Sequence, residues 1–587
     1  MDPEEDLPSR ALLWLHNQPA NSHLPETKKL ASLFPNGPRL SDDQLDIIIC
    51  DSEGMVYSVF QAFIADFLSV LELVEGLGDP DHVYKRKVKK GAHCVDVSYV
   101  LTLLILTPPA LDDYLERLPP ALSPSDLVHS SHKLADLLGG EMPSIHLGRP
   151  GGAPVAIFNP ALASLQRCLD NLEEVQVSRS EVERAAKYLR CAVAFYEDAA
   201  HRQRAIKELV NEAIGEKGEW GHALSWADNI KPDGSWWYDS FLILVLELNN
   251  TLGLSGDALL QAVIDYSKIV SRDKVRCPKC AALHTIAYLC LQYKRFREYC
   301  NFPVVLLGVT ANRLEISVAV CVGPIYVTKF LTLDLSLGFH ASNNIIRLAR
   351  VFGALSHCRL DLHNYYDRVS NLNFPRLSCL YPNPTLVDRS KTLPTLTYRQ
   401  FLSRAGRPTS ALVDLGNATT SMYIATLSDT DQEVIVKFTA RYNEVAHRLL
   451  ADADLAPKLH FCERVIGDLY MVIMDRIDGT SVWQLQEDKK PVPAIVLKGV
   501  RDAVHIFHAN DIVFGDLREP NILYLESKAR AMLVDFDGCG QDGKDRYPAT
   551  LNPSNAWAED VSPYSIMRKA HDTWQLDRLA ALCILAS

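Results

Sequence analysis

Residues 514–523 read FGDLREPNIL and residues 533–537 read LVDFD, and these two stretches decide how the last third of the sequence is interpreted. Asp516 and Asn521 lie five positions apart on a predicted turn, and an apolar strand follows Asn521 directly. A second apolar strand leads to Asp535. Phosphoryl transfer requires a carboxylate that orients the hydroxyl nucleophile and further oxygen ligands that hold metal ions on the phosphates. The spacing therefore predicts a phosphoryl-transfer site at these three residues.

A lysine and a glutamate further upstream complete the predicted site. Lys437 follows the apolar strand residues Val434–Val436, and Glu444 lies seven residues further on in a predicted helix. A lysine is most useful at nucleotide phosphates when a carboxylate from a neighbouring helix fixes its ammonium group. We therefore expect Glu444 to pair with Lys437. Short strands before these residues and helices after them predict a two-lobed α+β domain.

These residues resemble, in this order, the motifs of the protein-kinase fold, and FGDLREPNIL is similar to kinase-like domains common in fungal multidomain proteins. The resemblance implies that Asp516 is the catalytic-loop aspartate and that Lys437 serves both catalysis and ATP binding. It also implies that Glu444 supports ATP binding through this lysine, and that Asn521 and Asp535 are metal ligands. ATP and Mg²⁺ would then be the cofactors.

The sequence also departs from the kinase pattern. No G-x-G-x-x-G precedes the predicted lysine strand, and only Gly416 occupies that neighbourhood. Gly515 stands where many kinases carry an arginine that reads a phosphorylated activation loop, and Asp537 is the third residue of the DFG-like triplet. Arg518 is basic, like the lysine usual in Ser/Thr kinases, and favours a protein hydroxyl as acceptor. Asp572 resembles the buried aspartate that supports the catalytic loop. The expected function is ATP-dependent, Ser/Thr protein kinase-like phosphotransfer.

A second group of polar residues lies in the middle of the chain. Asp233 precedes an apolar strand that runs into Glu247 and Asn249. Side chains at positions i and i+2 of a strand share a face, so Glu247 and Asn249 point the same way. Two carboxylates that meet one divalent cation are the arrangement used in metal-assisted phosphodiester cleavage. An ordinary α/β core, with Asp233 ending a loop, is the alternative reading of this pattern.

This middle region resembles the restriction-endonuclease-like PD-(D/E)xK superfamily. The resemblance implies that Asp233 and Glu247 are metal ligands, that Gln261 belongs to a helix beside the site, and that Glu212 is a helix glutamate near it. Asn249, however, replaces the lysine of the motif. A neutral amide cannot stabilise the attacking hydroxide or the phosphorane charge as an ammonium group does. We therefore expect a degenerate site that binds nucleic acid without cleaving it.

The two resemblances predict a multidomain chain of α/β and α+β class, similar to the carboxy-terminal arrangement of Crinkler-type effectors and their fungal relatives. The C-terminal part would be a two-lobed, protein-kinase-like fold preceded by a restriction-endonuclease-like α/β domain. Breaks rich in proline and glycine suggest the boundaries. The predicted units are an α/β module of unknown role (1–140), the nuclease-like domain (141–372), a Pro-rich linker (373–394) and the kinase-like domain (395–587).

Composition limits the remaining possibilities. The net charge of −12 argues against a protein that coats nucleic acid along its whole surface. The apolar runs are far shorter than the ~20 residues that a membrane span needs. The opening MDPEEDLPSR resembles neither a secretory signal nor a transit peptide. Scattered cysteines favour reduced thiols in an intracellular protein, and the default extends to Cys277, Cys280 and His284, which otherwise suggest zinc. The basic run Lys85–Lys90 is either a nuclear-import signal or a solvated loop, which leaves nucleus and cytoplasm both open.

A binding protein is the competing interpretation. In it, a pseudokinase acts as a scaffold and is fused to an inactive nuclease-like domain that recognises nucleic acid through residues 141–372. The expected partners are thus ATP and a protein with a Ser or Thr hydroxyl, with nucleic acid as a further candidate and no membrane. Salt-sensitive DNA binding without ATP turnover would favour the scaffold.

Overall fold

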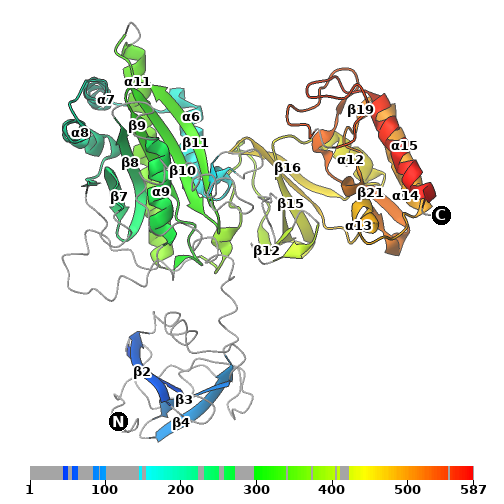
Figure 1. Cartoon of the computed structure of the whole chain (residues 1–587), viewed down its shortest axis with the longest axis horizontal. Coiled ribbons are helices and arrows are strands. Elements are labelled where there is room, and N and C mark those ends of the chain that lie inside the picture. The colour runs from blue at the N-terminus through cyan, green and yellow to red at the C-terminus, as the bar shows by residue number, and fades with distance from the viewer. Residues whose placement is uncertain are drawn as a thin grey trace.

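The chain has a mixed α/β architecture (Figure 1). A computed structural model describes residues 44–50, 56–63, 83–90, 93–100, 145–147, 154–221, 230–249, 257–271, 296–338, 341–371, 374–402, 406–409, 422–552 and 555–585. Gly416 and the candidate zinc ligands Cys277, Cys280 and His284 lie outside these residues. Among the described residues, no helix combines the length and the apolar character needed to cross a membrane.

Four strands form an antiparallel sheet near the N-terminus, in the order β2-β1-β3-β4. They are β1 (Gln44–Cys50), β2 (Val56–Phe63), β3 (Val83–Lys90) and β4 (His93–Val100). The basic run Lys85–Lys90 therefore belongs to a strand that pairs with β4. Its role in nuclear import stays a prediction.

The middle domain is built on a seven-stranded mixed sheet, in the order β5-β11-β10-β9-β8-β7-β6. Its strands are β5 (Ile145–Leu147), β6 (Glu219–Trp220), β7 (Gly234–Tyr238), β8 (Phe241–Asn249), β9 (Val304–Thr310), β10 (Arg313–Cys321) and β11 (Ile325–Asp334). Its helices are α6 (Pro160–Asp170), α7 (Arg179–Ala192), α8 (Ala199–Ile214), α9 (Ala258–Ser271) and α11 (Ala341–Ser370).

Helices cover this sheet because its central strands are apolar along their whole length. Every residue of β8 and β9 is buried, as expected for parallel neighbours that are covered on both faces. Figure 1 shows α9 lying against one face of the sheet. At Gly308 in β9, an added Cβ would lie 2.9 Å from the backbone nitrogen of Leu259, so glycine permits the close approach of α9. This close approach brings the side chains of α9 into contact with β8.

Two local features complete this domain. β9 and β10 pair antiparallel around Ala311, whose φ is 50°. Trp236 and Trp237 of β7 are both buried and belong to the apolar core of the domain.

The C-terminal part divides into a sheet lobe and a helical lobe (Figure 1). The sheet lobe holds a six-stranded antiparallel sheet, order β13-β12-β14-β15-β17-β16. Its elements are β12 (Leu396–Leu402), β13 (Pro408–Thr409), β14 (Met422–Leu427), β15 (Glu433–Thr439), α12 (Glu444–Asp452), β16 (Leu459–Val465) and β17 (Leu469–Asp475).

The helical lobe follows β17. Its helices are α13 (Val482–Glu487), α14 (Ala494–Ala509) and α15 (Lys569–Leu585). Its short strands are β18 (Thr480–Ser481), β19 (Ile512–Val513), β20 (Ile522–Leu525), β21 (Arg530–Leu533) and β22 (Gly540–Gln541). The apolar strands predicted after Asn521 and before Asp535 are thus formed, as the antiparallel pair β20–β21.

The Pro-rich segment between the middle domain and the sheet lobe is packed against both. Asn383 N–H donates to the carbonyl of Ile157 over 2.7 Å, while Leu386 bridges to Val465. The ring of Tyr381 stacks on those of the sheet lobe. One continuous apolar cluster runs from the middle domain into the sheet lobe. The segment therefore joins the two parts as a structural element and is more than a tether.

Candidate functional site

Lys437 lies at the junction of the sheet lobe and the helical lobe, and two carboxylates hold it. Its Nζ is 2.7 Å from Oδ1 of Asp535 and 2.8 Å from Oδ1 of Asp537. Burial opposes the positive charge, but the two carboxylates more than offset it and raise the pKa of Lys437. The lysine is therefore charged, and its position ties β15 to the segment after β21.

The backbone at Asp535 brings both carboxylates to one ammonium group. Asp535 has a φ of 70°, a left-handed conformation that aspartate tolerates better than most residues. The chain turns there into a short 3₁₀ helix, Phe536–Gly538. Thr439, which shares a face of β15 with Lys437, donates its hydroxyl to Oδ2 of Asp537 over 2.5 Å. Two side chains of one strand thus hold Asp537 in place.

The pKa values of the two aspartates move in opposite directions. Burial would raise the pKa of Asp535, but the charge of Lys437 and its hydrogen bond lower it below the usual range. Burial and the neighbouring charge of Asp535 raise the pKa of Asp537 to about 7. Asp535 is therefore the carboxylate that is ionised over the whole physiological range.

The structure does not bring Glu444 to Lys437. Glu444 is the first residue of α12, and its carboxylate pairs with Arg448 at 2.8 Å on the exposed side of that helix. Asn443 caps the helix by accepting from the N–H of Ala446. At the first position of the helix, Glu444 does not reach Lys437. The second carboxylate on the lysine is instead that of Asp537, two residues after Asp535.

Helix α12 instead contacts the site through His447. Its ring stacks on Phe536, with centroids 4.4 Å apart. Nε2 of His447 lies 2.8 Å from the carbonyl of Pro457, and Nδ1 lies 2.6 Å from the hydroxyl of Tyr442. Burial lowers the pKa of His447 to about 4, so the ring is neutral and its two nitrogens act as one donor and one acceptor. The contact fixes the segment that carries Asp535 and Asp537.

Asp516 and Asn521 lie side by side on the loop before β20. Nδ2 of Asn521 donates to the backbone carbonyl and to Oδ2 of Asp516, both over 2.9 Å. Arg518 also contacts Asp516 with two guanidinium nitrogens, and the Nη2–Oδ2 distance is 2.7 Å. The N–H of Val534 donates to the carbonyl of Asn521, which holds the strand leading into Asp535 against this loop. Four of the five polar residues predicted for this site are therefore gathered around one junction, namely Lys437, Asp516, Asn521 and Asp535.

The loop that carries Asp516 is anchored from below by Asp572 on α15. The Asp572 carboxylate is fully buried and accepts from the N–H groups of Phe514 (2.8 Å) and Gly515 (2.9 Å). A Cβ at Gly515 would lie 2.4 Å from the side chain of Met567, and its φ is 76°. An arginine in place of Gly515 would therefore not fit this loop. Asp572 has the supporting position expected from the sequence.

Asp535 and Asn521 are the residues of this junction that could hold a magnesium ion. Asp535 is ionised, and the carboxylate and amide oxygens of Asp535 and Asn521 are the hard ligands that Mg²⁺ prefers. The described residues contain no group of three or more His, Cys, Asp or Glu that could hold a metal ion on its own. Magnesium at nucleotide phosphates needs only one or two protein carboxylates, because the phosphates supply further oxygens.

In the middle domain, Asp233 and Glu247 also come together. The N–H of Asp233 donates to Oε1 of Glu247 over 3.3 Å, and Oδ2 of Asp233 accepts from the N–H of Leu248 over 2.8 Å. Gln203 on α8, which the sequence did not single out, donates to the carbonyl of Asp233 over 2.7 Å. Burial raises the pKa of Asp233.

A third carboxylate, that of Asp265 on α9, faces this pair. Burial, then the charges of Asp265 and Asp233, raise the pKa of Glu247 well above its usual range. Burial also raises the pKa of Asp265 to about 7, although the charge of Lys268 lowers it. Among the described residues, Oδ1 of Asp265 meets no hydrogen-bond donor. Burial therefore raises the pKa of all three carboxyl groups, whereas the pKa of Asp535 is lowered.

The other residues of the predicted nuclease-like site are only partly gathered here. Asn249 and Gln261 are buried, and the carbonyl of Asn249 accepts from Arg202 over 2.6 Å. Glu212 is exposed on α8, nine positions after Gln203 and hence on the opposite side of the helix. The structure does not bring Glu212 to the other residues. No periodicity in the sequence reveals Asp265, because only the packing of α9 brings it to β8.

Comparisons with known proteins add little. No family model matches the chain. No curated protein matches it either. Among solved structures, the chain is similar to the Cydia pomonella Granulovirus kinase, PK-1, with 17% sequence identity and a TM-score of 0.25. That match covers 32% of this chain and 68% of the viral one. A likeness at this level bears neither on fold nor on function.

Proposed function

We propose that residues 395–587 form a kinase-like domain that transfers a phosphoryl group from ATP. The observation that carries the proposal is the pairing of Lys437 with Asp535 at 2.7 Å, beside the contact between Asn521 and Asp516. Lys437 belongs to the sheet lobe, whereas the three other residues belong to the helical lobe. A lysine, a metal-binding aspartate, an asparagine and a second aspartate at one junction are the parts that phosphoryl transfer requires.

Each residue has one role in the proposed reaction. Lys437 binds phosphate oxygens of ATP, and Asp535 and Asn521 would hold magnesium, which neutralises charge on the phosphates. Asp516 orients the acceptor hydroxyl and takes its proton. The hydroxyl oxygen forms a bond to the γ-phosphorus while the bond from that phosphorus to the bridging oxygen breaks, which releases ADP. Arg518 must then share Asp516 with the acceptor, because it contacts both carboxylate oxygens.

The proposed acceptor is a hydroxyl group, with a Ser or Thr of a protein as the first candidate. Arg518 supports this choice because it lies two residues after Asp516 and presents a cation beside it. A cation at this place stabilises the negative charge that develops on the transferred group.

The experiment that tests the function is phosphate transfer from γ-labelled ATP with the full chain and Mg²⁺. The unsubstituted protein should label itself or a mixed Ser/Thr protein substrate, and Asp516→Ala should reduce the label to background. Equal background labelling of both proteins would reject catalysis. The remaining interpretation would then be a pseudokinase that acts as a scaffold.

We also propose that the middle domain is restriction-endonuclease-like and binds nucleic acid without cleaving it. The contact between Asp233 and Glu247 supports a shared site, and Asn249 in place of a lysine argues against cleavage. Plasmid DNA incubated with the full chain and Mg²⁺ or Mn²⁺ should stay intact, while binding should weaken as salt is added. Nicking that Glu247→Ala abolishes would overturn the predicted inactivity.

A further inference from the structure

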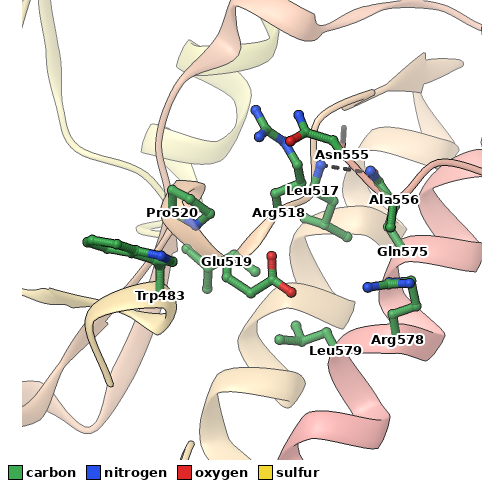
Figure 2. A pocket seen from close by; sticks show the side chains of 11 residues that line it. Trp483, Leu517, Arg518, Glu519, Pro520, Asn555, Ala556, Gln575, Arg578 and Leu579 are labelled. Carbon is green, nitrogen blue, oxygen red and sulfur yellow. Dashed lines mark hydrogen bonds between the residues drawn. The ribbon is translucent and has the colours of Figure 1, made fainter. Parts of the chain in front are cut away.

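A hollow of about 440 Å³ opens on the helical lobe next to the loop that carries Asp516. Its walls come from α13, from residues 517–522, from residues 555–556 and from α15. Figure 2 shows Trp483 on one side and Arg578 on the other, with Arg518 and Glu519 between them. Nothing in the proposed binding of ATP uses this hollow.

The hollow lies beside the loop of the proposed transfer site. Arg518 lines it and at the same time contacts both oxygens of Asp516. Leu517, the residue between them, lines it too, whereas Asp516 does not. A molecule in the hollow can therefore contact the arginine that holds the carboxylate of Asp516.

One buried amide nitrogen in the wall, Nε2 of Gln575, has no hydrogen-bond partner in the described part of the chain. Oε1 of Gln575 accepts from the N–H of Leu517 over 2.9 Å, which fixes the orientation of the amide. Its Nε2 meets no acceptor among the described residues, although the side chain is only 6% exposed. A buried donor without an acceptor is costly and calls for an explanation. A bound ligand that supplies an acceptor atom would satisfy it.

The charged groups around this amide favour an anion. Arg578 is exposed, and its guanidinium carbon lies 5.1 Å from the centroid of the Trp574 ring. Arg518 contacts Asp516 through Nε and Nη2, which leaves the remaining N–H groups of its guanidinium for another acceptor. Glu519 is the acidic side chain of the hollow. Guanidinium groups bind carboxylates and phosphates with paired, charge-assisted hydrogen bonds.

We propose that this hollow binds an oxyanion, either a carboxylate or a phosphate group, carried by the molecule that receives the phosphoryl group. The proposal rests on the proposed phosphotransfer, and it narrows the acceptor to hydroxyl compounds with an acidic group nearby. Gln575 Nε2 and the guanidinium of Arg578 bind the oxyanion. Arg518 turns part of its donors to the same group and so frees Asp516 for the hydroxyl.

The first measurement is binding, which does not require catalysis. Inorganic phosphate and a Ser-containing peptide flanked by glutamates are titrated into the full chain by calorimetry, with a peptide flanked by lysines as reference. Gln575→Glu keeps the acceptor for Leu517 N–H and replaces only the free donor. Arg578→Gln removes the exposed cation, and Lys528→Gln removes an equal charge from an exposed turn outside the hollow.

We expect each of the two pocket variants to weaken binding of the probe about tenfold, the value of one charge-assisted hydrogen bond. Lys528→Gln should change it less than twofold, and Glu519→Gln should strengthen it. Binding of phosphate alone would identify a small anionic acceptor, and binding of the acidic peptide a protein acceptor. Both support the proposal. No binding of either probe, or equal binding by all variants, would overturn it.

The second measurement separates the two proposals. Labelling of acidic and basic Ser/Thr peptide pools with γ-labelled ATP should favour the acidic pool, and Arg578→Gln should remove the preference by raising KM with kcat little changed. Anion binding that depends on Gln575 and Arg578 without any labelling would leave the oxyanion site standing and reject the phosphotransfer. Labelling of both pools to the same extent would support the phosphotransfer and reject the oxyanion site.

Discussion

The two acidic clusters of this chain differ in what faces their carboxylates. At the junction of the two C-terminal lobes, the ammonium group of Lys437 lies between Asp535 and Asp537. In the middle domain, Glu247 and Asp265 face each other instead. The first arrangement keeps Asp535 ionised, whereas the second raises the pKa of both groups. In both clusters burial raises the pKa of carboxyl groups, and only at Asp535 does a neighbouring cation reverse the shift.

The substitution with the largest expected effect removes that cation. Lys437→Met should lower phosphate transfer by at least about 100-fold, because a residue that stabilises transition-state charge is typically worth 2.7–4 kcal/mol. Steady-state labelling with γ-labelled ATP measures the loss. Transfer within a few-fold of the unsubstituted protein would mean that the lysine only neutralises its two aspartates.

A smaller loss is expected when one of the two carboxylates is neutralised. Asp537→Asn keeps the shape of the side chain but weakens its hold on Lys437, so we expect transfer to fall about tenfold, since one charge-assisted contact is worth about 1.4 kcal/mol. Thr439→Val removes the other contact of Asp537 and should also lower phosphate transfer, by less than tenfold. Separate values of kcat and of KM for ATP show which step suffers. Unchanged kinetics in both variants would mean that Asp535 alone holds Lys437 in position.

The middle cluster should respond in stability to pH. Asp265 has a pKa of about 7 in the fold but an ordinary one near 4 in the unfolded chain. The folded state thus binds this proton more tightly, and stability falls as pH rises from about 4 to about 7. Asp265→Asn cannot ionise, so at pH 8 it should be more stable than the original by about 1–2 kcal/mol, and at pH 4 nearly equal.

Thermal unfolding followed by the fluorescence of the buried Trp236 and Trp237 measures this difference. Glu212→Gln, at an exposed position of the same domain, is the matched control and should leave the pH dependence as it is. A variant less stable than the original at pH 8 would show that Lys268 or a cation compensates the charge of Asp265.

The smallest expected effect tests the helix partner that the sequence suggested. Glu444 pairs with Arg448 at the surface, and such pairs contribute only about 0.3–0.5 kcal/mol. Glu444→Gln should therefore change phosphate transfer less than twofold. A loss comparable with that of Lys437→Met would mean that α12 rotates and brings Glu444 to the lysine when ATP binds.

The difference between Glu444 and Asp535 also marks what the sequence can predict. Asp516, Asn521 and Asp535 each follow or precede an apolar strand, and strand pairing alone brings them to one edge. Glu444 depends on where its helix begins. Asn443 starts α12 one residue before it, and a helix start shifted by one residue turns a side chain by about 100°. Spacing in the sequence does not fix that start.

Other parts of the candidate sites depend on tertiary packing. Asp265 reaches Glu247 only because Gly308 admits α9 close to the sheet, and Gln575 reaches Leu517 only because Asp572 anchors α15 to the loop before it. Neither contact leaves a pattern in the sequence. The mixed α/β class was predictable, since it follows from local apolar periodicity.

The packed segment before β12 has a consequence for how this protein can be divided. Its Tyr381 covers Phe401 and Tyr398 of the sheet lobe, while its backbone bonds to the middle domain at Ile157. A fragment that begins at residue 395 would lose this cover and expose aromatic rings to water, at a cost of about 25 cal/mol for each Å² uncovered. A fragment of the C-terminal part that keeps this cover therefore has to start upstream of Tyr381.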